Sequence, residues 1–176
     1  MNNRQLLLNF EKYNSIWKQS LLNYSEKELV WKPSGMQWSL CQLYDHLNTL
    51  NELMLDEIQK CLEGKGKKIL KNKKLIVRII FYFNTLPPFK FKVPTEIKAV
   101  PEEVISKNEI IRKFEMVEER VKNIISSVIN SDPIIKTRHP KLGYFNASDW
   151  LAFITIHSKH HLNQKKNIER QIVKFS

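Results

Sequence analysis

Histidines are the side chains in this sequence best suited to bind a transition metal, because a neutral imidazole offers a nitrogen lone pair at physiological pH. The chain contains five: His46, His139, His157, His160 and His161. His157 and His161 are four residues apart within a segment, about residues 147–173, that has a helical pattern of apolar residues. Side chains at that spacing lie one helical turn apart on the same face, so both rings can reach a single ion.

The angular positions of these histidines separate inward from outward side chains. Successive residues of a helix turn by about 100°. If Trp150 is placed at zero, His157 and His161 fall within about 20° of it, on the apolar stripe that also holds Ile154. His160 falls about 80° from that stripe, toward a flank. We therefore expect His157 and His161 to point into the protein and His160 not to be a ligand.

His46 lies in a second helical segment, about residues 39–63, roughly 50° from the centre of its apolar stripe. Two interpretations fit three inward histidines. In the first, each is a core residue whose ring nitrogens are satisfied by hydrogen bonds nearby. Alternatively, the three form one facial set around a metal ion, which leaves coordination positions open for water or substrate.

The elements that position these residues are helices. Four long segments have apolar residues at helical spacing: about residues 4–23, 39–63, 106–130 (beginning near 101–106) and 147–173. Ser39 and Gln42 form a capping-box pattern at the start of the second segment, and Gly64 is a natural stop at its end. Four such helices with short or moderate connections predict an all-α, four-helix-bundle protein.

A basic segment, residues 65–92, follows the second helix. It holds nine lysines and arginines and no acidic residue, and we expect a helix or ordered turn around residues 73–85. Five apolar residues recur there at helical spacing: Leu75, Ile76, Ile79, Ile80 and Phe83. We expect them to be buried against the bundle, with the lysines directed to solvent. The sequence FKFKV (residues 89–93) has the alternation of a short strand but no predicted partner, and residues 139–149 are rich in turn residues.

Aromatic residues are interleaved with the basic ones in this segment, at Phe81, Tyr82, Phe83, Phe89 and Phe91. The alternative interpretation is therefore a surface that binds a nucleic-acid backbone or an anionic membrane. No recognition helix or single-strand-binding motif accompanies it, so we expect no specific nucleic-acid binding.

Composition excludes several other classes. Hydrophobic residues make up 42% and charged residues 27% of the 176 residues, the net charge is +11, and there is no glycine-rich phosphate-binding loop. Cys41 and Cys61 lie too far apart on one helix to form a disulfide and are expected to be reduced packing residues. The longest apolar run, Leu75–Phe83, is too short to span a membrane. Without a signal-peptide pattern at the N-terminus, we expect a cytoplasmic protein.

Two motifs resemble those of the DinB/YfiT-like superfamily. The first is Trp38-Ser39 with Gln42 and His46-Leu47, and the second is His157-Ser-Lys-His160-His161 followed by Gln164. Between them, His139-Pro140, Gly143-Tyr144 and Trp150 also fit the pattern of that group. The resemblance extends over roughly residues 5–172, and the basic segment departs from the shortest members.

The resemblance implies one domain over residues 1–176, an up-down-down-up four-helix bundle with the basic segment inserted after the second helix, and a homodimer. It also implies a site for nickel, zinc or iron whose ligands are His46, His157 and His161. Some members are thiol-dependent S-transferases that use bacillithiol or mycothiol, and one is a maleylpyruvate isomerase. A low-molecular-weight thiol is therefore an expected cosubstrate.

Two hypotheses for function follow. In the first, the chain is a metal-dependent transferase or hydrolase that activates a thiol or water toward a small electrophile. The catalytic acid or base is not identified: Glu57 and Asp45 are candidates on the second helix, with Asp45 expected to point outward. In the second, the chain is a non-catalytic binding module whose basic segment, residues 65–92, holds anionic partners.

Overall fold

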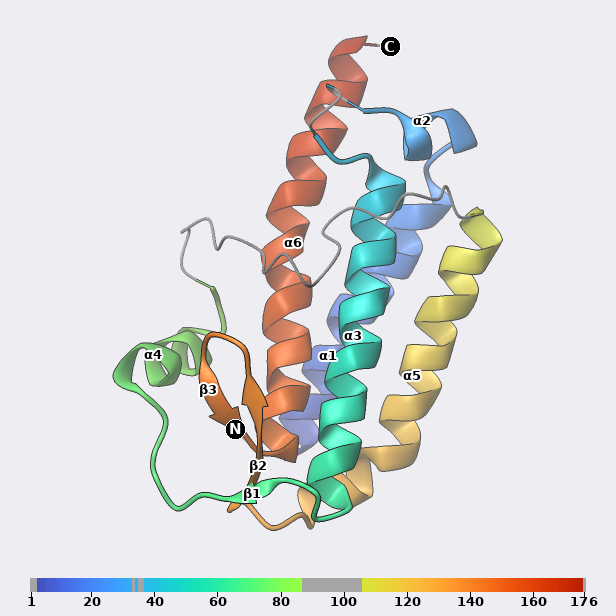
Figure 1. Ribbon diagram of the computed structural model, residues 1–176. Coiled ribbons are helices and arrows are strands. Elements are labelled where there is room, and N and C mark those ends of the chain that lie inside the picture. Colours follow the sequence, from blue (N-terminus) through green and yellow to red (C-terminus); the bar gives the residue numbers. More distant parts are fainter. Residues whose placement is uncertain (1–2, 33, 35–36, 87–105, 176) are drawn as a thin grey trace.

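The computed structural model describes residues 3–32, 34, 37–86 and 106–175. Four long helices form the bundle: α1 (Asn3–Leu22), α3 (Leu40–Leu62), α5 (Lys107–Ile129) and α6 (Ala147–Phe175). Two shorter helices are α2 (Glu26–Val30) and α4 (Leu75–Phe83). In Figure 1, α1 and α6 run in one direction while α3 and α5 run in the other, and α4 lies beside the base of the bundle. The predicted up-down-down-up four-helix bundle is confirmed.

The helix boundaries agree with the capping signals in the sequence. Ser39 is the N-cap of α3, where its side chain accepts from the backbone N–H of Gln42 and the Gln42 side chain accepts from the N–H of Ser39. This reciprocal pair satisfies two backbone donors that the first turn leaves unpaired. At the other end, Gly64 has a φ of +71°, a left-handed conformation that glycine adopts without steric strain.

Large buried side chains hold the four helices together. Trp17 is fully buried, and its indole nitrogen donates to the backbone oxygen of Ser158 at 3.2 Å. The hydroxyl of Tyr44 donates to the backbone oxygen of Trp17 at 3.1 Å, so α1, α3 and α6 are tied by polar as well as apolar contacts. Phe114 of α5 lies with its ring centroid 5.9 Å from that of Tyr44. The core therefore fixes how α3 and α6 lie beside each other.

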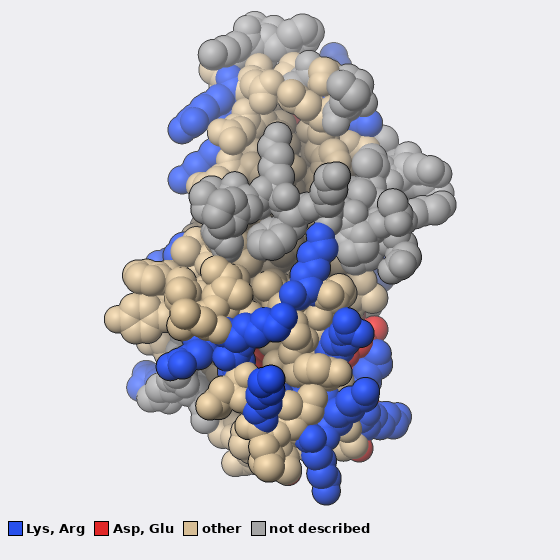
Figure 2. All heavy atoms as spheres, turned by 60° about the vertical axis from the view of Figure 1, so that its left-hand side comes forward, with Lys and Arg blue, Asp and Glu red and all other residues tan. Residues whose placement is uncertain are grey.

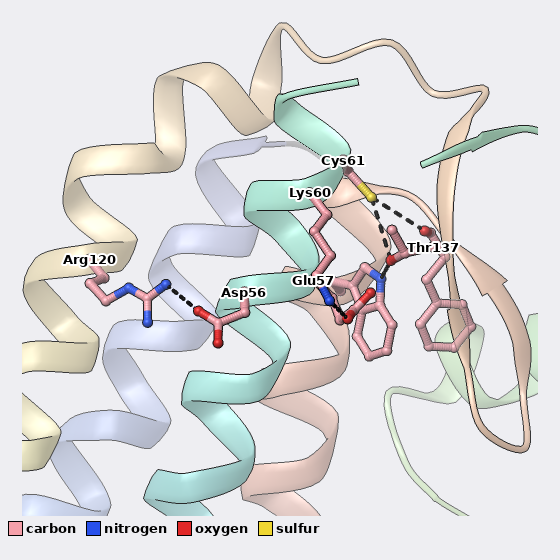
Figure 3. Close-up of polar contacts among 8 residues, drawn as sticks. Asp56, Glu57, Lys60, Cys61, Arg120 and Thr137 are labelled. Carbon is pink, nitrogen blue, oxygen red and sulfur yellow. Dashed lines mark hydrogen bonds and ion pairs between the residues drawn. The ribbon is translucent and has the colours of Figure 1, made fainter. Parts of the chain in front are cut away.

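A small sheet lies at the base of the bundle, and the loop predicted at residues 139–149 is in part a strand: residues 140–142 form a turn, as expected, but residues 143–145 are extended. β2 (Ile135–His139) and β3 (Gly143–Phe145) form an antiparallel hairpin, and β1 (Lys67–Lys68) pairs with β2. The strands are too short to give a recognisable alternation. Tertiary contacts stabilise them instead: Cys61 of α3 contacts the side chain of Thr137 and the backbone oxygen of Phe145 (Figure 3).

Both cysteines are buried and unbridged, as predicted. The thiol of Cys61 lies 3.7 Å from the Thr137 hydroxyl, and burial raises its pKa. In Figure 3 the opposite face of α3 carries Asp56, which is ion-paired with Arg120 of α5 at 2.9 Å. One face of α3 thus contacts the sheet while another is joined to α5 by charge.

The expected burial of the basic segment's apolar residues is largely wrong. Of the five predicted to be buried, only Ile80 is; Leu75, Ile76, Ile79 and Phe83 are exposed. α4 packs on the bundle through Val77, Ile80 and the half-buried Phe81, whose ring lies 5.3 Å from that of Phe145. A single helix lying on a surface buries one face, so a helix that is apolar all round leaves the other exposed. The proposed FKFKV strand lies outside the described residues.

Of the described helices, none combines the length and the apolar composition needed to cross a membrane. α4, the most apolar of them in sequence, has only nine residues.

We expect the fold to lose stability in acid because of His139, the histidine of the hairpin. Burial lowers the pKa of His139 from 6.5 to about 4, and its Nδ1 accepts from the backbone N–H groups of Lys141 and Leu142. Above pH 6.5 the ring is neutral in both states. As pH falls from 6.5 toward 4, only the unfolded chain takes up the proton, so stability is lost across that window, by up to about 3 kcal/mol from this group.

Replacing this histidine tests the assignment. His139→Asn keeps an acceptor near the Nδ1 position but does not titrate. We expect it to lower stability at neutral pH through lost ring packing, and to reduce proton uptake on unfolding by about one proton. Denaturant titrations across the acid range measure that uptake. An unchanged pH slope in the variant would show that His139 is not held neutral.

Candidate metal centre

Two neighbouring helices bring three histidines together. His46 lies in the second turn of α3, while His157 and His161 lie one turn apart near the middle of α6. The capping box at Ser39 fixes where α3 begins, and the buried neighbours Leu47 and Ile154 fix the rotation of each helix about its axis. The three residues that sequence spacing placed inward are therefore on facing surfaces.

The ring nitrogens of the three histidines converge. One nitrogen from each lies within 4.8 Å of the others, and the Nε2 atoms of His157 and His161 are 3.0 Å apart. Two nitrogens bound at adjacent positions of one ion, each about 2.0–2.1 Å from it, would themselves lie about 3 Å apart. The pair on α6 already has that separation. The wider separations, up to 4.8 Å, involve His46.

Burial keeps these imidazoles neutral. His157 and His161 are each 8% exposed, and His46 is half-buried. Loss of solvation lowers the pKa of His46 to about 4 and that of His161 to about 3, and it lowers the pKa of His157 as well. Positive charge on any one ring would also repel the others. Neutral imidazole is the form that donates a lone pair to a metal.

Gln164 fixes the orientation of one ring. Its side-chain oxygen lies 2.9 Å from Nδ1 of His161. Because an amide oxygen only accepts, Nδ1 of His161 carries the proton and Nε2 presents its lone pair toward His157. A histidine that binds a metal through one nitrogen commonly donates from the other to such a partner. Gln164 was part of the sequence motif, but its role was not predicted from spacing.

One nitrogen of the cluster is buried and has no hydrogen-bond partner. Nδ1 of His157 contacts no donor or acceptor among the residues that the structure describes. A buried polar atom without a partner is destabilising, so the His157 ring is not a fully satisfied core histidine. Three neutral imidazoles, one of them already oriented, are a donor set suited to nickel, zinc or iron. The residues present therefore fit a divalent metal.

Aromatic side chains surround the three rings. Trp38 lies edge-on to His46, with ring centroids 4.8 Å apart, and Phe153 is stacked with His157 at 6.4 Å. His160 is half-buried on the flank, with its ring centroid 5.3 Å from that of His161. His139, the fifth histidine, contacts Phe153 from the hairpin. His160 thus occupies the flanking position that its helical angle predicted.

The two candidate carboxylates are held in ion pairs. Asp45 binds Lys113 of α5 at 2.7 Å, so the expectation that Asp45 points outward is wrong: it faces the neighbouring helix. Glu57 binds Lys60 at 2.6 Å on the surface of α3. Neither belongs to the histidine cluster.

A buried polar cluster near the site was missed from the sequence. Lys165, one turn beyond His161, is 6% exposed; its Nζ lies 2.8 Å from Glu169 and donates to the Tyr24 hydroxyl at 3.0 Å. Tyr24 also donates to Glu169. A lysine on the inward stripe of α6 was the available signal, because a buried lysine requires partners.

Comparison with known proteins extends these observations. The uncharacterised protein YuaE of Bacillus subtilis (strain 168) is 26% identical over 136 residues, which cover 77% of this chain and 80% of YuaE. In the solved structures, TT2238, described as a four-helix bundle protein, superposes with a TM-score of 0.61 at 12% identity. That alignment covers 94% of this chain and 99% of TT2238, and it supports the fold.

The family match covers most of the chain. Residues 14–164 match the DinB superfamily, a range that contains α3, the hairpin, and the half of α6 that carries the histidines. The chain therefore belongs to the DinB superfamily.

Proposed function

We propose that the protein binds one divalent metal ion through His46, His157 and His161, and that it is a metal-dependent enzyme acting on a small electrophile. The observation that supports this most directly is the convergence of three buried imidazole nitrogens within 4.8 Å. Nickel, zinc and iron are the metals that match an all-imidazole set. The proposed reaction is transfer of a low-molecular-weight thiol or hydrolysis.

The competing explanation, three hydrogen-bonded core histidines, accounts less well for the contacts. It provides a partner for Nδ1 of His161 but none for Nδ1 of His157. It accounts for the 3.0 Å contact between the two Nε2 atoms on α6 as an N–H···N hydrogen bond, but it gives no reason for a third ring, from α3, to converge on them. A shared ion would bind one nitrogen from each of the three rings.

A metal held by three protein ligands keeps open positions at which it lowers the pKa of an incoming thiol or water. The chain's own residues supply the conditions for that chemistry. Gln164 orients the His161 ring, and Trp38 and Phe153 line the cluster with apolar surface that limits access of water. Because Asp45 and Glu57 are ion-paired with lysines, we assign no carboxylate as the base.

Measuring the metal content of two variants distinguishes a histidine that binds the metal from a neighbouring histidine on α6 that does not. His157→Ala should remove most of the bound metal, because two remaining imidazoles bind an ion far more weakly. His160→Ala, the matched control one turn away on the flank, should leave metal content close to that of the parent. Elemental analysis of protein purified without an affinity tag measures both. Equal losses from the two variants would contradict the ligand assignment.

Removing the hydrogen bond between Gln164 and His161 should lower the affinity for metal, but by less than removing a ligand. Gln164→Leu keeps the size of the side chain but removes the acceptor for Nδ1 of His161, so affinity for zinc should fall by about 10- to 100-fold. Gln171→Leu on the same helix removes an amide that donates to the backbone oxygen of Asn167, and it should change affinity less than about twofold. Competition titration with a chromogenic chelator gives both constants.

Activity is tested with the metal-loaded full chain, cysteine as the thiol and monochlorobimane as the electrophile, with p-nitrophenyl acetate for hydrolysis. We expect one of the two reactions to be accelerated above the uncatalysed rate, and His46→Ala to abolish the acceleration. His160→Ala should retain it. Protein that holds one metal ion yet accelerates neither reaction would refute the proposed chemistry while leaving the metal site intact.

A further inference from the structure

α4 presents an apolar surface to solvent that the bundle does not use. The α4 apolar face consists of Leu75, Ile76, Ile79, Tyr82 and Phe83. Tyr82 is 83% exposed, Leu75 71% and Phe83 63%. These side chains occupy one side of the helix, whereas the buried Val77 and Ile80 occupy the other. A contiguous exposed patch of large apolar side chains marks a surface that contacts something else.

Basic residues precede this face along the chain. The exposed residues Lys67, Lys68, Lys71 and Lys74 precede α4, and Arg78 is its only charged residue. No acidic residue occurs between positions 64 and 86. Figure 2 shows this side of the molecule, where lysine and arginine side chains gather beside a protrusion of uncharged residues and few acidic side chains are visible. The partner must therefore combine negative charge with an apolar interior.

Three kinds of partner fit this combination unequally. Nucleic acid matches the lysines, and bases stack on aromatic side chains such as Tyr82 and Phe83, but the exposed Leu75, Ile76 and Ile79 offer bases no stacking surface. A second copy of the chain matches the apolar residues but brings an equal cluster of positive charge against the first. An anionic lipid surface matches both features, because headgroup phosphates attract the lysines while the acyl boundary accepts the apolar side chains.

We propose that the α4 apolar face docks the protein onto anionic lipid membranes as a peripheral contact. With nine residues, α4 is too short to cross a bilayer, and it lies on the bundle through Val77, Ile80 and Phe81. Its outer side chains enter the headgroup–acyl boundary and the lysines bind phosphates around them. This function is separate from metal binding, since neither α3 nor α6 contributes to the face.

The experiment is vesicle flotation with the full chain, using phosphatidylcholine vesicles with and without an equal part of phosphatidylglycerol. We expect binding only when phosphatidylglycerol is present, and release at about 0.5 M salt, where charge interactions are screened over about 4 Å. Phe83→Ser should weaken binding about tenfold. Leu22→Ser, at a residue that is also 63% exposed but lies at the end of α1, is the matched control and should change binding less than about twofold.

A charge-reversed pair tests the electrostatic contribution. The double variant Lys71→Glu with Lys74→Glu should weaken binding at least about tenfold. The control is Lys166→Glu with Arg170→Glu, which makes the same change in net charge at exposed positions of α6. Equal effects of the two pairs would overturn the proposal, as would equal binding to both vesicle types.

The Phe83→Ser variant also tests whether the α4 apolar face is covered by another part of the chain or by a second copy of it. Phe83→Ser should leave the melting temperature and sedimentation behaviour of the free protein unchanged. A large fall in melting temperature would show that the face is covered within the molecule, and dissociation of a dimer would show that a second copy occupies it. Tight, salt-resistant binding of DNA would assign the basic segment to nucleic acid. Each of these three results overturns membrane docking.

Discussion

The contact between α3 and α6 is the interaction on which the candidate site depends. His46 is presented by one helix and His157 with His161 by the other, so the geometry of the cluster is the geometry of this helix pair. A slip of one residue along either helix would shift a ring by about 1.5 Å and turn it by about 100°. The capping box at Ser39 and the hydrogen bond from Trp17 to Ser158 oppose such movements at two separate points.

Much of this arrangement was predictable from the sequence, because it rests on local periodicity. The four long helices, the Ser39 and Gly64 boundaries and the inward angles of His157 and His161 all follow from helical geometry. What was missed depends on contacts distant in sequence. The strands β2 and β3 are stabilised by Cys61 and by the bond from Trp150 to Thr137, and the direction of Asp45 is set by Lys113. The cytoplasmic location and homodimer stay predictions.

Burial of the three histidine rings also makes the cluster depend on the side chains that surround it. Three rings held neutral by desolvation form a donor set whose hydrogen bonds are incomplete in the protein alone. Phe81 of α4 stacks with Phe153, which in turn stacks with His157, so the wall of the site extends to the helix that carries the apolar face. The hairpin joins this wall through Phe145, next to both Phe81 and Phe153.

The parallel orientation of α3 and α5 has a consequence for how such a protein can diverge. The chain must return along the full length of the bundle between them, a distance of about 35 Å for a 23-residue helix, which an extended chain covers in about ten residues. Residues 63–106 far exceed that minimum and include β1 and α4. None of the three clustered histidines lies on this crossover, which reaches the wall of the site through Phe81. Away from that contact, residues can be added to or removed from the crossover without moving the helices that carry the histidines.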